Sequence, residues 1–137
     1  MDAFLLDTHA WIWLQEGLPG LSASTVATID AARGNNKVFV SAVSVWELGN
    51  LEIRRRVKLH STIDEWLRMA FTIGRLQLIP LDAQIALASS RLPGDLHRDP
   101  ADRMIVATAR VSDLTLLTRD ARLLDYGRKG HLRTRKI

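Results

Sequence analysis

The chain has 137 residues, a length typical of one domain, and we expect residues 1–137 to form that single domain. Hydrophobic residues make up 47% of the chain and charged residues 25%, a balance typical of a soluble globular protein. The chain has no cysteine, which excludes disulfides and thiolate metal sites. A net charge of +4 and a pI of about 10.1 favour a polyanionic partner such as nucleic acid, although a merely soluble surface has the same composition.

The sequence gives no sign of a membrane or export segment. No stretch approaches the ~18 consecutive apolar residues that indicate a transmembrane helix. At the N-terminus, Asp2, Asp7 and His9 interrupt any pattern of a signal peptide. We therefore expect a cytoplasmic protein without a membrane partner.

Short apolar runs alternate along the chain with segments of helical character. Strands are expected at 3–6, 37–41, 76–80, 114–118 and 132–135. Helices are expected at 8–16, from Ser22 or Ser24 to about 33, at 44–53, at 61–73 with Ser61 as cap, at 82–91 and at 100–111, with a short helical turn at 121–124. Strands that alternate with helices in this way predict an α/β fold, with helices packed on a parallel sheet.

Four acidic residues are expected at one edge of this sheet. Asp7 ends the first strand and Asp120 follows the fourth, while Glu47 and Asp102 lie on helices whose first turns face the same edge. Carboxylates gathered beside apolar surface repel one another unless a cation compensates them. Oxygen ligands of this kind suit Mg²⁺ or Mn²⁺. The sequence therefore predicts a metal site that activates water for the cleavage of a phosphodiester bond.

Each acid also has a purely structural interpretation. Asp7 can be the N-cap of the following helix, with Thr8 as an alternative cap. Glu47 lies among apolar neighbours that indicate a largely buried helix, where it can form a salt bridge with an arginine. Asp102 is in the first turn of a helix, which favours acids, and Asp120 can be a turn residue.

The segment 97–103 is rich in polar groups. Asp99 precedes Pro100 and is the natural N-cap of the next helix. From that position it can also support the metal site indirectly, by contacting the ligands and not the ion. Arg103 can contact a phosphate or pair with a buried acid. For His97, a position facing the site and a position away from it remain equally open.

Positive charge concentrates at 54–58 and at 128–136. We expect Arg54, Arg55, Lys58 and Arg103 to bind the phosphate backbone of a nucleic acid electrostatically, so that binding weakens as salt rises. Thr118, just before Asp120, can donate a hydrogen bond to a neighbouring carboxylate.

Four segments, taken in chain order, resemble the PIN-domain ribonucleases, specifically the VapC-type toxins of bacterial toxin–antitoxin pairs. They read Leu5-Leu6-Asp7-Thr8-His9-Ala10-Trp11, Ser41-Ala42-Val43-Ser44-Val45-Trp46-Glu47, His97-Arg98-Asp99-Pro100-Ala101-Asp102-Arg103 with the helix that follows, and Leu116-Leu117-Thr118-Arg119-Asp120. The resemblance implies a three-layer α/β/α sandwich with a mostly parallel central sheet, and RNA cleavage that depends on Mg²⁺ or Mn²⁺. It also implies a homodimer that a cognate VapB-type antitoxin holds inactive.

By motif position, the resemblance assigns the family's metal-site acids to Asp7, Glu47, Asp102 and Asp120, with Asp99 as an additional acid. The family often has a lysine in the helix after the glutamate, and residues 48–54 of this chain contain none. The basic contacts of that region are therefore expected from residues 54–58.

The resulting hypothesis is a metal-dependent endoribonuclease toxin, and two other classes compete with it. A phosphotransfer fold of the haloacid-dehalogenase kind needs a second aspartate at position 9, where this chain has His9. A receiver fold needs a lysine after a late strand, and Thr118-Arg119-Asp120 supplies none. A non-catalytic RNA- or protein-binding module fits the basic charge, but four acids near an RNA backbone would weaken its binding.

Overall fold

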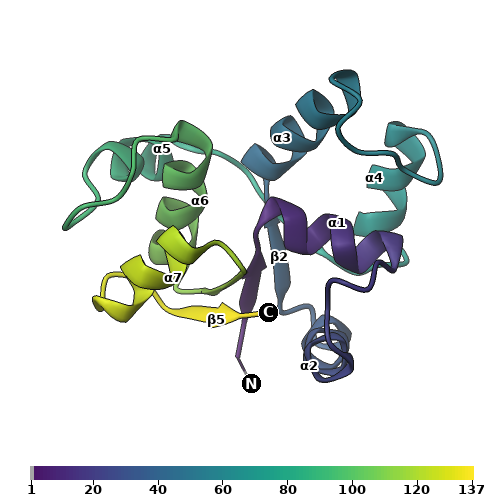
Figure 1. The fold of residues 1–137 in the computed structure, drawn as a ribbon, viewed down its shortest axis with the longest axis horizontal. Coiled ribbons are helices and arrows are strands. Elements are labelled where there is room, and N and C mark those ends of the chain that lie inside the picture. Colours follow the sequence, from purple (N-terminus) through teal and green to yellow (C-terminus); the bar gives the residue numbers. More distant parts are fainter. Residues whose placement is uncertain (1) are drawn as a thin grey trace.

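The structure, a computed structural model, describes residues 2–137, in which strands and helices alternate around a central sheet (Figure 1). The strands are β1 (Phe4–Leu6), β2 (Val38–Ser41), β3 (Gln77–Ile79), β4 (Thr115–Thr118) and β5 (Thr134–Lys136). The helices are α1 (Thr8–Glu16), α2 (Ala23–Gly34), α3 (Ala42–Ile53), α4 (Ile63–Phe71), α5 (Ala83–Ser90), α6 (Pro100–Val111) and α7 (Ala121–Arg128). The predicted α/β class is confirmed.

The sheet is parallel throughout, with the strand order β3-β2-β1-β4-β5. β1 is the central strand, and Leu5 lies in register with Phe39 on one side and Leu116 on the other. Side chains of β1 alternate between the two faces, so Leu5 packs in one core and Leu6 in the other. α6 and α7 cover the first face, and α1, α2 and α4 cover the second (Figure 1). The three-layer sandwich is confirmed.

Every helix begins at a residue whose side-chain oxygen accepts a hydrogen bond from the first turn. These caps are Asp7, Ser22, Ser41, Thr62, Asp82, Asp99 and Asp120. The prediction of Ser61 as the cap of α4 is wrong, because the hydroxyl of Thr62 accepts from the backbone N–H of Glu65 at 3.3 Å. Two adjacent hydroxyl residues offer the same local signal, so the sequence alone does not distinguish between them.

α7 is a longer helix than the expected turn at 121–124, and it ends at Arg128. Its length follows from packing, since Leu123 and Tyr126 are buried in the core and the Tyr126 hydroxyl donates to the carbonyl of Pro93 at 2.5 Å. Gly127 lies where a Cβ atom would collide with the side chain of Thr134. A glycine that looks like a helix end in the sequence therefore lets α7 pack closely against β5.

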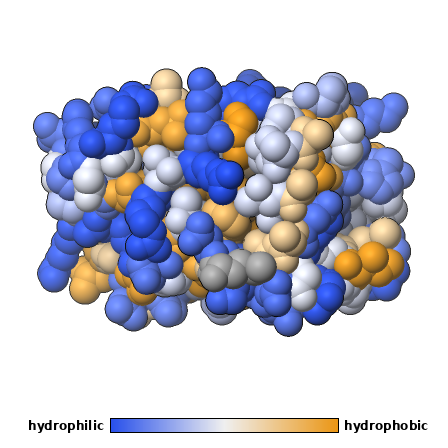
Figure 2. Space-filling view, turned by 90° about the horizontal axis from the view of Figure 1, so that it is seen from below, coloured by the Kyte–Doolittle hydropathy of each residue, from blue (hydrophilic) through white to orange (hydrophobic). Residues whose placement is uncertain are grey.

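Polar and charged residues cover much of the surface. Figure 2 shows one face, on which hydrophilic residues separate smaller apolar patches. Among residues 2–137, no helix is long and apolar enough to cross a membrane.

We predict that Leu6→Ala lowers the free energy of unfolding by about 2–5 kcal/mol, because the side chain is fully buried on the central strand and its loss leaves a cavity. Urea denaturation of both proteins measures the difference. The matched control is Leu87→Ala on α5, where the leucine is 52% exposed and the change should stay within about 0.5 kcal/mol. Equal losses in the two variants would contradict this assignment of the core.

Candidate metal centre

The four predicted acids line one cavity of about 410 Å³ beyond the carboxyl ends of β1 and β4. Asp99 lines it as well. The remaining lining residues are Thr8, His9, Trp13, Ile105, Arg119, Arg122 and Leu123. Segments more than a hundred residues apart in the chain therefore contribute carboxylates to a single space, as parallel strands with sites at their carboxyl ends lead one to expect.

Asp7 is both the N-cap of α1 and one of the acids that line the cavity. Its Oδ1 atom caps α1 by accepting from the backbone N–H of Ala10 at 2.8 Å, and its Oδ2 atom accepts from the hydroxyl of Thr118. Burial raises the pKa of Asp7, and the nearby carboxylate of Asp102 adds to the increase, while the two hydrogen bonds work in the opposite direction. The carboxylate thus carries an electrostatic cost that a bound cation would relieve.

Glu47, in the second turn of α3, is held by a hydroxyl and not by an arginine. The hydroxyl of Thr8 donates to its Oε1 atom at 2.5 Å and also lies 2.9 Å from the hydroxyl of Ser44. Within residues 2–137, Glu47 forms no ion pair. Burial raises the pKa of Glu47, with further increases from Asp102 and Asp99. The expected largely buried helix is only partly so, because Trp46 is 64% exposed.

Asp102 faces the cavity from the first turn of α6. Its Oδ2 atom lies 2.7 Å from Nε2 of His97, which donates to it because an ionised carboxylate can only accept. Asp99 caps the helix by accepting from the backbone N–H of Asp102 at 3.1 Å. His97 therefore contacts one of the predicted acids, although it is not among the residues that line the cavity. Asp99 fixes the start of the helix that carries Asp102.

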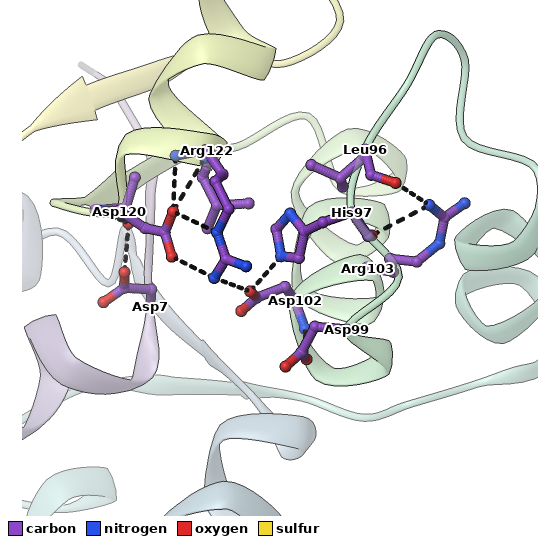
Figure 3. Close-up of polar contacts among 10 residues, drawn as sticks. Asp7, Leu96, His97, Asp99, Asp102, Arg103, Asp120 and Arg122 are labelled. Atoms are coloured by element: carbon purple, nitrogen blue, oxygen red, sulfur yellow. Dashed lines mark hydrogen bonds and ion pairs between the residues drawn. The ribbon is translucent and has the colours of Figure 1, made fainter.

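Arg103 points away from the acids, towards the loop that precedes α6 (Figure 3). Its Nε atom donates to the carbonyl of Ser89 and its Nη1 atom to the carbonyl of Leu96, both at 3.0 Å. The guanidinium thus connects α6 both to the end of α5 and to the loop between the two helices. Pairing with an acid is not seen among the described residues, and contact with RNA stays a prediction.

Asp120 caps α7 and is paired with Arg122, a residue that the sequence analysis missed. The Nη2 atom of Arg122 lies 3.1 Å from Oδ2 of Asp120 and 3.6 Å from Oδ2 of Asp102, between the two acids (Figure 3). Burial alone would raise the pKa of Asp120, but the hydrogen bonds and charge of Arg122 outweigh it and hold the pKa below its usual range. A signal was present: Arg122 is a cation in the first turn of a helix, where the helix dipole disfavours positive charge.

The basic residues lie at different distances from the acids. Arg119 is on the cavity wall, where its guanidinium lies 4.5 Å above the ring of Trp13 and donates to the carbonyls of Ile137 and Gly20. Arg54 lines an adjoining cavity together with Glu47 and Asp99. Arg55 and Lys58 are exposed on the segment that follows.

The donor set of the cavity fits a hard cation, because its four principal acids offer only carboxylate oxygens. The carboxylates lie farther apart than the ligands of a bound ion would: among residues 2–137, no three His, Asp or Glu side chains are close enough together to hold an ion. Binding would therefore require the carboxylates to move closer to one another. Two of these carboxylates, Asp102 and Asp120, form ion pairs with Arg122.

Residues 4–129 match the family described as PIN domain. This chain belongs to the PIN domain family. The PIN domain is 30% identical over 126 residues to Ribonuclease VapC22 of Mycobacterium tuberculosis, a match that covers 92% of this chain and 93% of that protein.

Solved structures share the fold of this PIN domain at lower identity. The structure of VapBC2 from Rickettsia felis bound to a promoter DNA fragment matches with a TM-score of 0.72 and 18% identity, covering 98% of each chain. DNA-bound VapBC from Salmonella typhimurium matches with a TM-score of 0.68 and 19% identity, covering 99% of this chain and 98% of that one. At such identity the likeness shows the fold alone.

We predict that Asp7→Asn stabilises the PIN domain at neutral pH in EDTA, and that its advantage over the wild type shrinks as the pH falls. Because the folded pKa of Asp7 lies above the ordinary 3.8, the wild type loses stability as the pH rises from that value through the folded pKa. The asparagine side chain of the variant keeps the cap without the charge. Urea denaturation between pH 4 and pH 8 measures the difference.

The control for the change of cap is Asp82→Asn, since Asp82 caps α5 through the backbone N–H of Ile85 at 2.9 Å on the exposed surface. A difference between Asp7→Asn and wild type that stays constant over the whole pH range would contradict the prediction.

Proposed function

We propose that this PIN domain is a metal-dependent endoribonuclease and the toxin of a type II toxin–antitoxin pair. One observation carries the proposal: four carboxylates from separate segments meet in one cavity of a chain that is 30% identical to a ribonuclease over nearly its whole length. The charge of +4 supports an RNA substrate.

In this proposal Asp7 and Asp102 are the principal ligands of Mg²⁺ or Mn²⁺, and Glu47 and Asp120 complete the site directly or through water. When bound, the ion supplies a water of lowered pKa and compensates charge on the phosphate. The chain's own residues prepare the ligands, since the hydroxyls of Thr118 and Thr8 orient Asp7 and Glu47. Asp99 supports Asp102 by capping α6.

Substrate binding is proposed for Arg54, Arg55 and Lys58. Of these, Arg54 lines a cavity together with Glu47 and Asp99. Arg103 remains a proposed RNA contact, through its Nη2 atom, because its Nε and Nη1 atoms are already engaged. These contacts are electrostatic, so RNA affinity should fall with rising salt.

We predict that Asp7→Asn and Asp102→Asn each reduce the rate of RNA cleavage in Mg²⁺ or Mn²⁺ by more than about 100-fold. Loss of a residue that only hydrogen-bonds to a metal ligand typically lowers activity about 10- to 100-fold, and loss of the ligand itself should lower it further. Cleavage of a single-stranded RNA, with EDTA as the metal-free reaction, measures the effect. Circular dichroism checks that both variants are folded.

The matched control is Asp113→Asn, which removes an exposed carboxylate that pairs with Arg133, at the opposite end of β4. Its cleavage rate should equal that of the wild type. Wild-type cleavage that persists in EDTA, or full activity of either cavity variant, would contradict the proposal. RNA binding without any cleavage would favour the non-catalytic module.

We further propose two protein partners, a VapB-type antitoxin and a second copy of this chain. The structural neighbours are VapBC complexes, which supports the antitoxin. For the second copy, the chain offers an apolar cavity of about 370 Å³ without a charged lining residue, formed by Ala42, Val43, Trp46, Leu81, Pro100, Ala101 and Met104. A two-fold interface pairs a patch with itself, which an uncharged patch allows without repulsion between like charges.

We predict that the wild type sediments or elutes at about twice the chain mass of 15.4 kDa, and that Trp46→Ser shifts it towards the monomer. Light scattering after size exclusion measures the mass. Ile73→Ser is the control, because Ile73 is 75% exposed but lies outside the patch. If Trp46→Ser stays dimeric and loses the antitoxin instead, the patch belongs to that partner.

A further inference from the structure

Arg122 occupies the space between two of the proposed metal ligands. Its Nη2 atom lies 3.1 Å from a carboxylate oxygen of Asp120 and 3.6 Å from one of Asp102. Asp120 starts α7 and Asp102 lies in the first turn of α6, so the contact joins two helices across the cavity (Figure 3). Within residues 2–137, no other arginine or lysine forms an ion pair with any of the four acids.

The position of Arg122 is unfavourable for its own helix. It is the second residue of α7, where the helix dipole and the unpaired N–H groups favour a negative side chain. A basic residue at this point is therefore explained by the acids that it contacts and not by the stability of α7. The contact is also easily broken, because the side chain of Arg122 is 60% exposed and water can screen its charge.

Arg119 gives the matched comparison on the same wall. It carries the same charge and lines the same cavity, but its guanidinium is fixed by the carbonyls of Ile137 and Gly20 and by the ring of Trp13. It forms no ion pair with the four acids among the described residues. The two arginines thus separate the general effect of a positive charge from the effect of direct contact with the ligands.

We propose that Arg122 is an internal counter-ion of the acidic cavity, which competes with the divalent cation for Asp102 and Asp120 and is displaced when the cation binds. The inference rests on the proposed function, because it takes these two acids as metal ligands. A carboxylate oxygen that accepts from a guanidinium is less available to a cation, so Arg122 weakens metal binding. When no ion is bound, the same contact reduces the repulsion between Asp102 and Asp120.

The proposal is tested by titrating Mn²⁺ into the whole chain by calorimetry at low ionic strength, with wild type, Arg122→Gln and Arg119→Gln. Arg122→Gln should bind Mn²⁺ more tightly by up to about fivefold, the range expected for loss of a competing exposed ion pair. Arg119→Gln should change the affinity by clearly less. The advantage of Arg122→Gln should shrink as NaCl is added.

Thermal unfolding supplies a second readout that does not depend on RNA cleavage. In EDTA, Arg122→Gln should melt at a lower temperature than the wild type, because the two carboxylates lose their counter-ion. Its rise in Tm on addition of Mn²⁺ should be larger than that of the wild type. Arg122→Lys keeps the charge without the planar fork and should give an Mn²⁺ affinity between those of wild type and Arg122→Gln.

Three results would overturn the proposal: an unchanged or weaker Mn²⁺ affinity of Arg122→Gln, an equal gain in Arg119→Gln, or no Mn²⁺ binding by any variant. The RNA cleavage assay separates this failure from that of the proposed function. If the wild type cleaves RNA with Mn²⁺ while Arg122→Gln binds Mn²⁺ like the wild type, the nuclease proposal stands and the role of Arg122 falls.

Discussion

Four carboxylates in one partly buried cavity repel each other, and the surrounding structure is arranged to compensate them. Each acid has its own donor: Asp7 a threonine hydroxyl and a backbone N–H, Glu47 a threonine hydroxyl, Asp102 a histidine, and Asp120 an arginine. The donors to Asp7 and Glu47 are uncharged, and burial raises the pKa values of both acids nonetheless. The remaining electrostatic cost is one that a bound cation would relieve.

The parallel sheet explains why the acids meet where they do. All strands point the same way, so the helices that directly follow β1, β2 and β4 begin at a common edge. Asp7 and Asp120 cap two of these helices, and Asp102 lies in the first turn of α6, which begins at the same place. The positive ends of three helix dipoles therefore stabilise the negative charge of the cavity. The parallel topology thus brings the helix N-termini together at one edge, and the residues at those positions provide the carboxylates.

Features that depend only on residues nearby in the chain could be predicted from the sequence. The bounds of α1 follow from a capping aspartate and a stopping glycine, Gly17, and the placement of the acids follows from strand ends. Features that depend on distant contacts were not predictable in this way. The partner of Glu47 is a threonine and not an arginine, and the role of Arg122 requires knowing that α6 and α7 begin side by side. Likewise, the full length of α7 depends on the burial of Leu123 and Tyr126 and on the close packing of Gly127 against β5.

The hydrogen bond from Thr118 to Asp7 joins residues 111 positions apart, and the central strand β1 pairs with β4 over a similar span. During synthesis, the segment that contains Asp7 leaves the ribosome long before its neighbour on one side exists. The acidic cavity therefore cannot assemble from the N-terminal part of the nascent chain alone, and it forms only after β4 and Asp120 have also been made.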